Sequence, residues 1–169
     1  MTDKTSDPDA TLARYAGGPA QLEDALDGLK ESDLNFSPTS TSWTIRQIVH
    51  HIVDGDDFWK ICIKAALGDT EGRFSLEWYW NKPQTEWVKN WRYGDRPIEP
   101  SLALFRINRQ HIVDLVQQTP NAWEKSVRIS TPRNEDARIT IGEMLEIQAS
   151  HVDEHISEIK TLLRRGKII

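Results

Sequence analysis

A long amphipathic pattern near the C-terminus most constrains the fold of this chain. From about Ile141 to Arg165, apolar residues recur at the spacing that places them on one face of an α-helix. Thr140 and Glu143 have the T-x-x-E spacing of a capping box, which predicts the start of the helix, and Gly166 predicts its end. This segment is the last and longest of four such patterns.

The three earlier patterns are expected to form helices over about residues 19–30, 44–67 and 101–118. Pro19 is placed at the first helical position of the first of them, and Ser42 gives the second a polar start. Four amphipathic patterns account for nearly all the apolar periodicity. The sequence therefore predicts an all-α fold, a four-helix bundle with long crossover loops after the second and third helices.

The remaining segments are expected to be less regular. Residues 1–14 are rich in Thr, Ser and Asp and are expected to form a flexible tail, with a short helix near Leu12 to Tyr15 as the alternative, and residues 15–169 are expected to form a single helical domain. Short helices are expected near 76–81 and 85–91, within the first crossover. Strand is expected to be absent or confined to a hairpin within 127–139.

Four tryptophans lie in the first crossover: Trp78, Trp80, Trp87 and Trp91. One interpretation is a satellite core that packs this connection onto the bundle. The other is a substrate cleft near the bundle, since apolar walls with few polar groups are typical of small-molecule sites. Both interpretations stay open, because different tryptophans can serve different roles.

Histidines in two of the predicted helices suggest a metal site. His151 and His155 are four residues apart, so they project from one helical face, close enough to bind one ion. They border the apolar stripe of their helix. A third ligand can come from His50 or His51 in the second pattern, which lie on opposite sides of its apolar stripe. Apolar neighbours widen that stripe on the side of His51, which favours His51 as the inward residue.

These motifs resemble the DinB/YfiT-like superfamily. The resemblance rests on W-T-I-R-Q-I-V-H-H, which begins at Trp43, and on H-x-x-x-H in the last helix. In that family, the histidine eight residues after the tryptophan and the two late histidines bind a divalent metal in a four-helix bundle. The resemblance therefore implies His51, His151 and His155 as the ligands here. It also implies one metal ion per chain.

Other polar residues near these motifs are candidates for supporting contacts. His50, Asp54 and Glu154 are expected to lie close enough to orient the ligands. Glu154 also completes an H-x-x-E-H signature, but a peptidase of that type needs an acidic ligand well downstream, and only fourteen residues follow His155. His111 lies near the margin of the third pattern and is favoured as an ordinary helix histidine.

Three imidazoles would leave one metal position open, as in catalytic sites. Zinc is favoured as the ion and nickel follows, since imidazole suits both. A metal-bound water or hydroxide would support hydrolysis, whereas a bound thiol would support transfer or isomerisation. Thiol-dependent transfer is favoured, partly because the better-understood relatives resemble thiol transferases. A hydrolase is the alternative, and a non-catalytic metal-binding or stress-response bundle is the third hypothesis.

Composition narrows the expected partners. The formal net charge of -5, with Lys and Arg scattered along the chain, argues against nucleic-acid binding. An N-terminus without an apolar core and the lack of a long apolar run predict a cytoplasmic protein that does not enter membranes, and the single cysteine, Cys62, suits a reducing compartment. The expected partners are a small-molecule substrate, with a low-molecular-weight thiol as one candidate, and a second copy of the chain as a homodimer.

Overall fold

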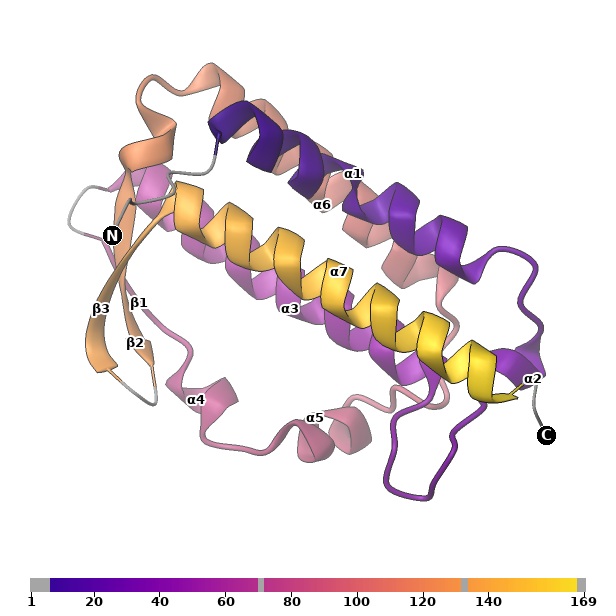
Figure 1. Ribbon diagram of the computed structural model, residues 1–169. Helices are drawn as coiled ribbons and strands as arrows, with labels where there is room; N and C mark the ends of the chain where they lie inside the picture. The colour runs from indigo at the N-terminus through magenta and orange to yellow at the C-terminus, as the bar shows by residue number, and fades with distance from the viewer. Residues whose placement is uncertain (1–6, 70–71, 132–133, 167–169) are drawn as a thin grey trace, which may run out of the picture.

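Four long helices dominate the computed structural model, which describes residues 7–69, 72–131 and 134–166. They are α1 (Pro8–Leu26), α3 (Ile45–Gly68), α6 (Glu99–Gln118) and α7 (Ile141–Gly166), and they form one bundle (Figure 1). One long connection lies between α3 and α6, and the other lies between α6 and α7. The predicted four-helix bundle and its two crossovers are therefore confirmed.

The order of the helices in the bundle explains the long connection between α3 and α6. α1 and α3 each pack against both α6 and α7, which places α1 and α3 on one diagonal. α3 and α6 run in the same direction, whereas α7 runs opposite to α3 (Figure 1). Because two parallel neighbours cannot be joined by a tight turn, the chain between α3 and α6 must travel back along the bundle.

The first helix begins well before the predicted position. α1 starts at Pro8, after the side chain of Asp7 accepts a hydrogen bond from the backbone N–H of Asp9 at its N-terminus. Residues 8–14, which were expected in a flexible tail, are therefore helical, and the predicted start at Pro19 is wrong. The first six residues of that tail lie outside the described part of the chain.

Pro19 lies inside α1 because a distant residue replaces the hydrogen bond that proline removes. A proline at this position cannot donate to the carbonyl four residues earlier, which is that of Tyr15. The Arg109 guanidinium of α6 donates to the Tyr15 carbonyl instead, at 2.6 Å. Gly18 lets this side chain approach, because a Cβ atom there would overlap the guanidinium. α1 therefore continues through Gly18 and Pro19, a sequence that usually marks the start of a helix.

Arg109 is also the centre of a buried polar cluster. Its side chain is 1% exposed and donates to Asp56 of α3, at 2.9 Å, and to the Gln148 carbonyl of α7, at 3.0 Å. The guanidinium lies against the rings of Tyr15 and Phe105, 4.1 Å and 4.5 Å from their centroids. One side chain thereby connects all four long helices.

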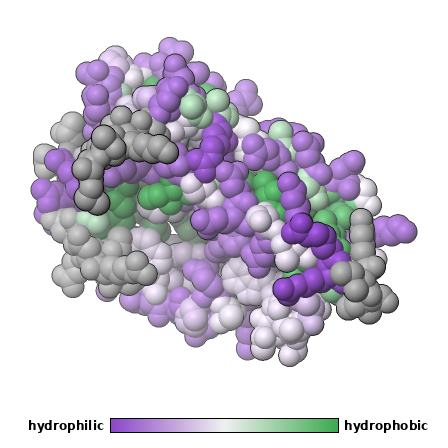
Figure 2. All heavy atoms as spheres, viewed as in Figure 1, coloured by the Kyte–Doolittle hydropathy of each residue, from purple (hydrophilic) through white to green (hydrophobic). Residues whose placement is uncertain are grey.

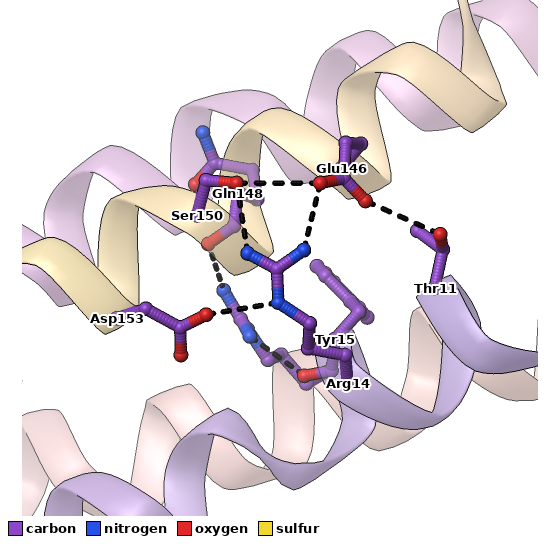
Figure 3. A network of polar contacts seen from close by, with 8 residues as sticks. Thr11, Arg14, Tyr15, Glu146, Gln148, Ser150 and Asp153 are labelled. Atoms are coloured by element: carbon purple, nitrogen blue, oxygen red, sulfur yellow. Dashed lines mark hydrogen bonds and ion pairs between the residues drawn. The ribbon is translucent and has the colours of Figure 1, made fainter. Parts of the chain in front are cut away.

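A second polar network joins α1 to the outer side of α7 (Figure 3). Arg14 donates to Glu146 at 2.7 Å, to Asp153 at 2.8 Å and to Ser150 at 2.9 Å. These three acceptors span about two turns of α7, directly before and within its H-x-x-x-H motif. The network therefore sets the position of α1 along the helix that carries two of the histidines.

The capping box of α7 is present as predicted. Glu143 accepts from the Thr140 backbone N–H at 2.8 Å, and Thr140 Oγ1 accepts from the Glu143 backbone N–H at 3.2 Å. In α3, the capping residue is Thr44 and not Ser42, since Thr44 Oγ1 accepts from the Gln47 backbone N–H. The sequence places this start correctly to within two residues.

We expect Thr140→Ala to lower the free energy of unfolding by about 1 kcal/mol, because it removes the side-chain acceptor at the start of α7. Urea denaturation of the metal-free protein gives this value. Thr41→Ala, in an exposed loop, is the control and should change stability by less than about 0.5 kcal/mol. Equal effects of the two variants would contradict a capping role for Thr140.

A small sheet and several short helices complete the fold. β2 (Ser126–Thr131) and β3 (Asn134–Thr140) are antiparallel, which confirms the predicted hairpin. β1 (Arg73–Ser75) pairs in parallel with β2, so the expectation of no strand outside 127–139 is wrong. The short helices α4 (Glu77–Trp80) and α5 (Gln84–Asn90) lie where they were predicted, whereas α2 (Glu31–Leu34) and the 3-10 helix η1 (Ala122–Glu124) were not predicted.

The surface seen in Figure 2 is mostly hydrophilic, with apolar side chains visible in small patches. Among the described helices, none combines the length and apolar character that crossing a bilayer requires.

Candidate metal centre

The three predicted ligands meet between two neighbouring helices. His51 projects from α3, and His151 and His155 project from α7. The Nε2 atom of His151 lies 3.2 Å from Nε2 of His51 and 3.2 Å from Nε2 of His155. One ligand atom from each of the three residues falls within 4.8 Å of the others. Two motifs a hundred residues apart therefore form one cluster, which we call the histidine triad.

The spacing of these nitrogens fits a single small divalent ion. Tetrahedral coordination with metal–nitrogen bonds of about 2.0–2.1 Å separates two ligand nitrogens by about 3.3–3.4 Å. The two 3.2 Å separations in the triad are close to that value. Three imidazoles supply three of four positions, so one position is left for another ligand.

Burial keeps His51 and His151 neutral, as metal binding requires. Desolvation is the main cause that lowers the pKa of His51 from 6.5 to about 3 and that of His151 to about 4. Repulsion from the neighbouring imidazoles, when they are charged, acts in the same direction. At neutral pH, the imidazoles of His51 and His151 can therefore each offer a lone pair without the release of a proton from an imidazolium.

These two pKa values make the metal-free protein sensitive to acid. Between about pH 4 and pH 6.5, the unfolded chain binds protons at His51 and His151 that the folded chain does not bind. The free energy of unfolding should therefore fall as the pH is lowered from 7 to 5, by up to about 1.4 kcal/mol per pH unit for each histidine.

Urea denaturation of the metal-free protein at several pH values measures this slope. The double variant His51→Gln/His151→Gln is the control, because glutamine does not titrate. A slope as steep in the double variant as in the wild type would show that other groups cause the acid sensitivity.

Three further residues lie next to the triad, and one of them, Glu158, is an acid. Nδ1 of His155 lies 2.9 Å from the Glu158 carboxylate, one turn further along α7. The Trp43 ring packs edge-on against His51, with 4.9 Å between ring centroids. Gly55 faces His151, where a Cβ atom would lie 3.7 Å from the ring. The i,i+3 spacing of His155 and Glu158 is the sequence feature that could have identified Glu158.

The residues predicted to support the ligands are placed differently. His50 is fully buried, and its two ring nitrogens contact Ser101 Oγ at 2.9 Å and the Arg96 carbonyl at 3.3 Å. Asp54 accepts a hydrogen bond from Tyr93 and lies 3.8 Å from the Arg96 guanidinium. Both residues thereby hold the segment that leads into α6. Glu154 and His111 are exposed on their helices.

The crossover tryptophans mainly form a satellite core. Trp78 and Trp87 pack against each other and against Tyr79, with ring centroids 5.5–5.8 Å apart. Trp80 packs against the main core of the bundle instead. Trp91 contacts Trp87 at 4.8 Å and Phe58 of α3 at 5.9 Å. The first of the two interpretations therefore describes Trp78, Trp80 and Trp87.

Trp91 also lines a pocket. This pocket has a volume of about 210 Å³ and is lined by Asp54, Asp57, Phe58, Trp91 and Arg96. Asp54 and Phe58 follow His51 by three and seven residues, whereas Asp54 and Asp57 follow His50 by four and seven. The pocket therefore lies over the side of α3 between His50 and His51, and its lining includes none of the triad histidines.

Comparisons with known proteins agree with this fold and this site. The family model of the DinB superfamily matches residues 14–159. A protein of Oceanobacillus iheyensis, provisionally named a metal-dependent hydrolase, is 29% identical over 148 residues, which cover 87% of this chain and 80% of that protein. YfiT of Bacillus subtilis carries the same provisional name and is 28% identical over 156 residues, covering 87% of this chain and 79% of its own.

A solved structure of YfiT from Bacillus subtilis is similar in fold. It superposes with a TM-score of 0.82 and 21% identity, covering 99% of this chain and 94% of that chain. It is described as having an unusual four-helix bundle topology. The match to the DinB superfamily model extends over most of the chain and includes all three histidines of the triad. The chain therefore belongs to the DinB superfamily.

Proposed function

We propose that this protein is a metal-dependent hydrolase that holds one divalent ion at His51, His151 and His155. The observation that carries the proposal is the cluster of three imidazoles between α3 and α7, in which Nε2 of His151 lies 3.2 Å from Nε2 of both His51 and His155. The provisional names of the relatives support the same activity. Zinc is the first candidate for the ion and nickel the second.

The chain's own contribution is to hold three imidazole donors close together. A divalent ion held there would supply Lewis acidity and would lower the pKa of a water molecule bound to it. Trp43 limits the movement of His51 by packing against its ring, and Glu158 contacts His155. Gly55 faces His151 without a side chain.

The polar lining of the pocket on α3 favours water as the attacking reagent. Three of its five lining residues are charged, namely Asp54, Asp57 and Arg96. A narrow aromatic cleft would favour an organic thiol, but only Phe58 and Trp91 supply aromatic walls here. The preference for thiol-dependent transfer drawn from the sequence is therefore reversed in this proposal. The substrate is a small molecule, part of which occupies about 210 Å³.

The proposal is tested with metal-loaded protein and a panel of small ester and amide substrates, with and without added thiol. We expect hydrolysis without thiol, loss of hydrolysis after chelation, and recovery when zinc or nickel is returned. His155→Ala is the inactive control, and His111→Ala, an exposed histidine of α6, is the matched control that should keep activity. Conjugation that requires thiol would favour the transferase. Metal binding without turnover of either kind would favour a non-catalytic bundle.

A further inference from the structure

Glu158 contacts the outer nitrogen of one member of the histidine triad. Its carboxylate Oε2 lies 2.9 Å from Nδ1 of His155, while Nε2 of the same ring faces His151 at 3.2 Å. We propose that Glu158 is a positioning residue, which holds the His155 imidazole with its hydrogen on Nδ1 and its lone pair on Nε2, directed at the metal. This inference rests on the metal site of the proposed function.

The chemistry of the two groups determines which nitrogen carries the hydrogen. A neutral imidazole has one N–H, and an ionised carboxylate can only accept a hydrogen bond. The 2.9 Å contact therefore places the hydrogen of His155 on Nδ1. This leaves Nε2 as the donor atom, and a carboxylate behind a ligating imidazole both orients the ring and increases its basicity.

Other acids of α7 near the motif are committed to different partners. Glu146 and Asp153 both accept from Arg14 of α1, at 2.7 Å and 2.8 Å (Figure 3). Glu143 caps the start of the helix, and Glu154 is exposed. Glu158 is the acid whose described contact goes to a triad imidazole. The function expected of Glu154 from the sequence therefore falls to Glu158, one helical turn later.

The other two ligands have uncharged neighbours. His51 packs against the Trp43 ring, and Gly55 faces the His151 ring. The side chain of His155 keeps 18% of its surface exposed, and Glu158 keeps 47%. The described contacts of the His155 ring are with the two other imidazoles, at 5.0 Å and 4.6 Å between centroids, and with Glu158. The carboxylate is the one of these three neighbours whose charge specifies the nitrogen that carries the hydrogen.

The test compares Glu158→Ala with Glu154→Ala, which removes the same charge from an exposed position next to His155. Competition with a chromophoric chelator gives the zinc dissociation constant of each. We expect Glu158→Ala to weaken zinc binding by about 10–100-fold and Glu154→Ala to leave it within about twofold. Glu158→Gln keeps an acceptor oxygen, so its loss should be smaller than that of Glu158→Ala.

Nitrogen-15 spectra of the histidine rings in the metal-free protein provide a readout that a merely structural role would not change. The His155 ring should be protonated on Nδ1 in the wild type and should populate both tautomers in Glu158→Ala. Unchanged tautomers together with equal zinc affinities in the two alanine variants would overturn the role of Glu158 alone. A wild-type protein that binds no zinc would instead overturn the proposed function, and this inference with it.

Discussion

Replacing Arg109 by alanine is expected to lower the free energy of unfolding by about 3–5 kcal/mol, the range for removing one partner of a buried ion pair. Arg109 and Asp56 are each 1% exposed, and their closest atoms are 2.9 Å apart. Without the guanidinium, the Asp56 carboxylate would remain buried without its cation. The Tyr15 carbonyl cannot accept a hydrogen bond from Pro19, so it would also lose the hydrogen bond that Arg109 donates.

Urea denaturation of the metal-free protein measures this change. Arg106→Ala is the matched control, because Arg106 lies on the same helix with 62% of its side chain exposed and forms only a surface ion pair with Glu23. That variant should change the stability by less than about 1 kcal/mol. If Arg109→Ala were equally mild, the buried cluster would not hold the four helices together as we describe.

His51→Ala is expected to weaken zinc binding by more than about 100-fold. The substitution removes a ligand itself, and removing a residue that only orients a ligand already costs about 10–100-fold. His50→Ala is the adjacent control. Both ring nitrogens of His50 are engaged with Ser101 and the Arg96 carbonyl, on the side of α3 that faces α6. The control should therefore keep zinc affinity within about threefold while it lowers stability.

The two variants give opposite results if the triad is assigned correctly. Metal content of the purified proteins, followed by chelator competition, distinguishes them. A His51→Ala protein with full zinc affinity, beside a His50→Ala protein that has lost it, would show that the wrong histidine of the pair had been assigned.

The triad could be predicted because each histidine is placed on its helix by residues close to it in the sequence. His151 and His155 share one helical face by their spacing, whereas the choice of His51 over His50 rested on both the apolar residues around it and the resemblance to the DinB/YfiT-like superfamily. The structure shows why that choice was difficult, since His50 is buried as well. Both histidines point inward, and they differ in whether they face α6 or α7.

The start of α1 could not be predicted from the neighbouring sequence. Gly17, Gly18 and Pro19 normally mark a helix boundary. Here the missing backbone donor is replaced by Arg109, ninety residues later in the chain. Nothing local to Pro19 indicates that compensation, because it exists only once α6 packs against α1.

The short strand β1 was missed for a related reason. Three residues, Arg73 to Ser75, are too few to show an alternating pattern, and their partner strand is β2, more than fifty residues away. The sequence does not distinguish the two interpretations of the crossover tryptophans, because aromatic composition is the same in a satellite core and in a cleft. In the structure, Trp78 and Trp87 pack against each other, as the satellite-core interpretation predicts.

Anomalous diffraction from zinc-soaked crystals, recorded on both sides of the zinc absorption edge, tests the metal centre most directly. We expect one strong peak per chain, about 2.0–2.1 Å from Nε2 of His51, His151 and His155, with one further coordination position not filled by protein. The peak should disappear in the triple His→Ala variant. A strong peak elsewhere on the chain, or none between α3 and α7 at saturating zinc, would contradict the assignment of the triad as the metal centre.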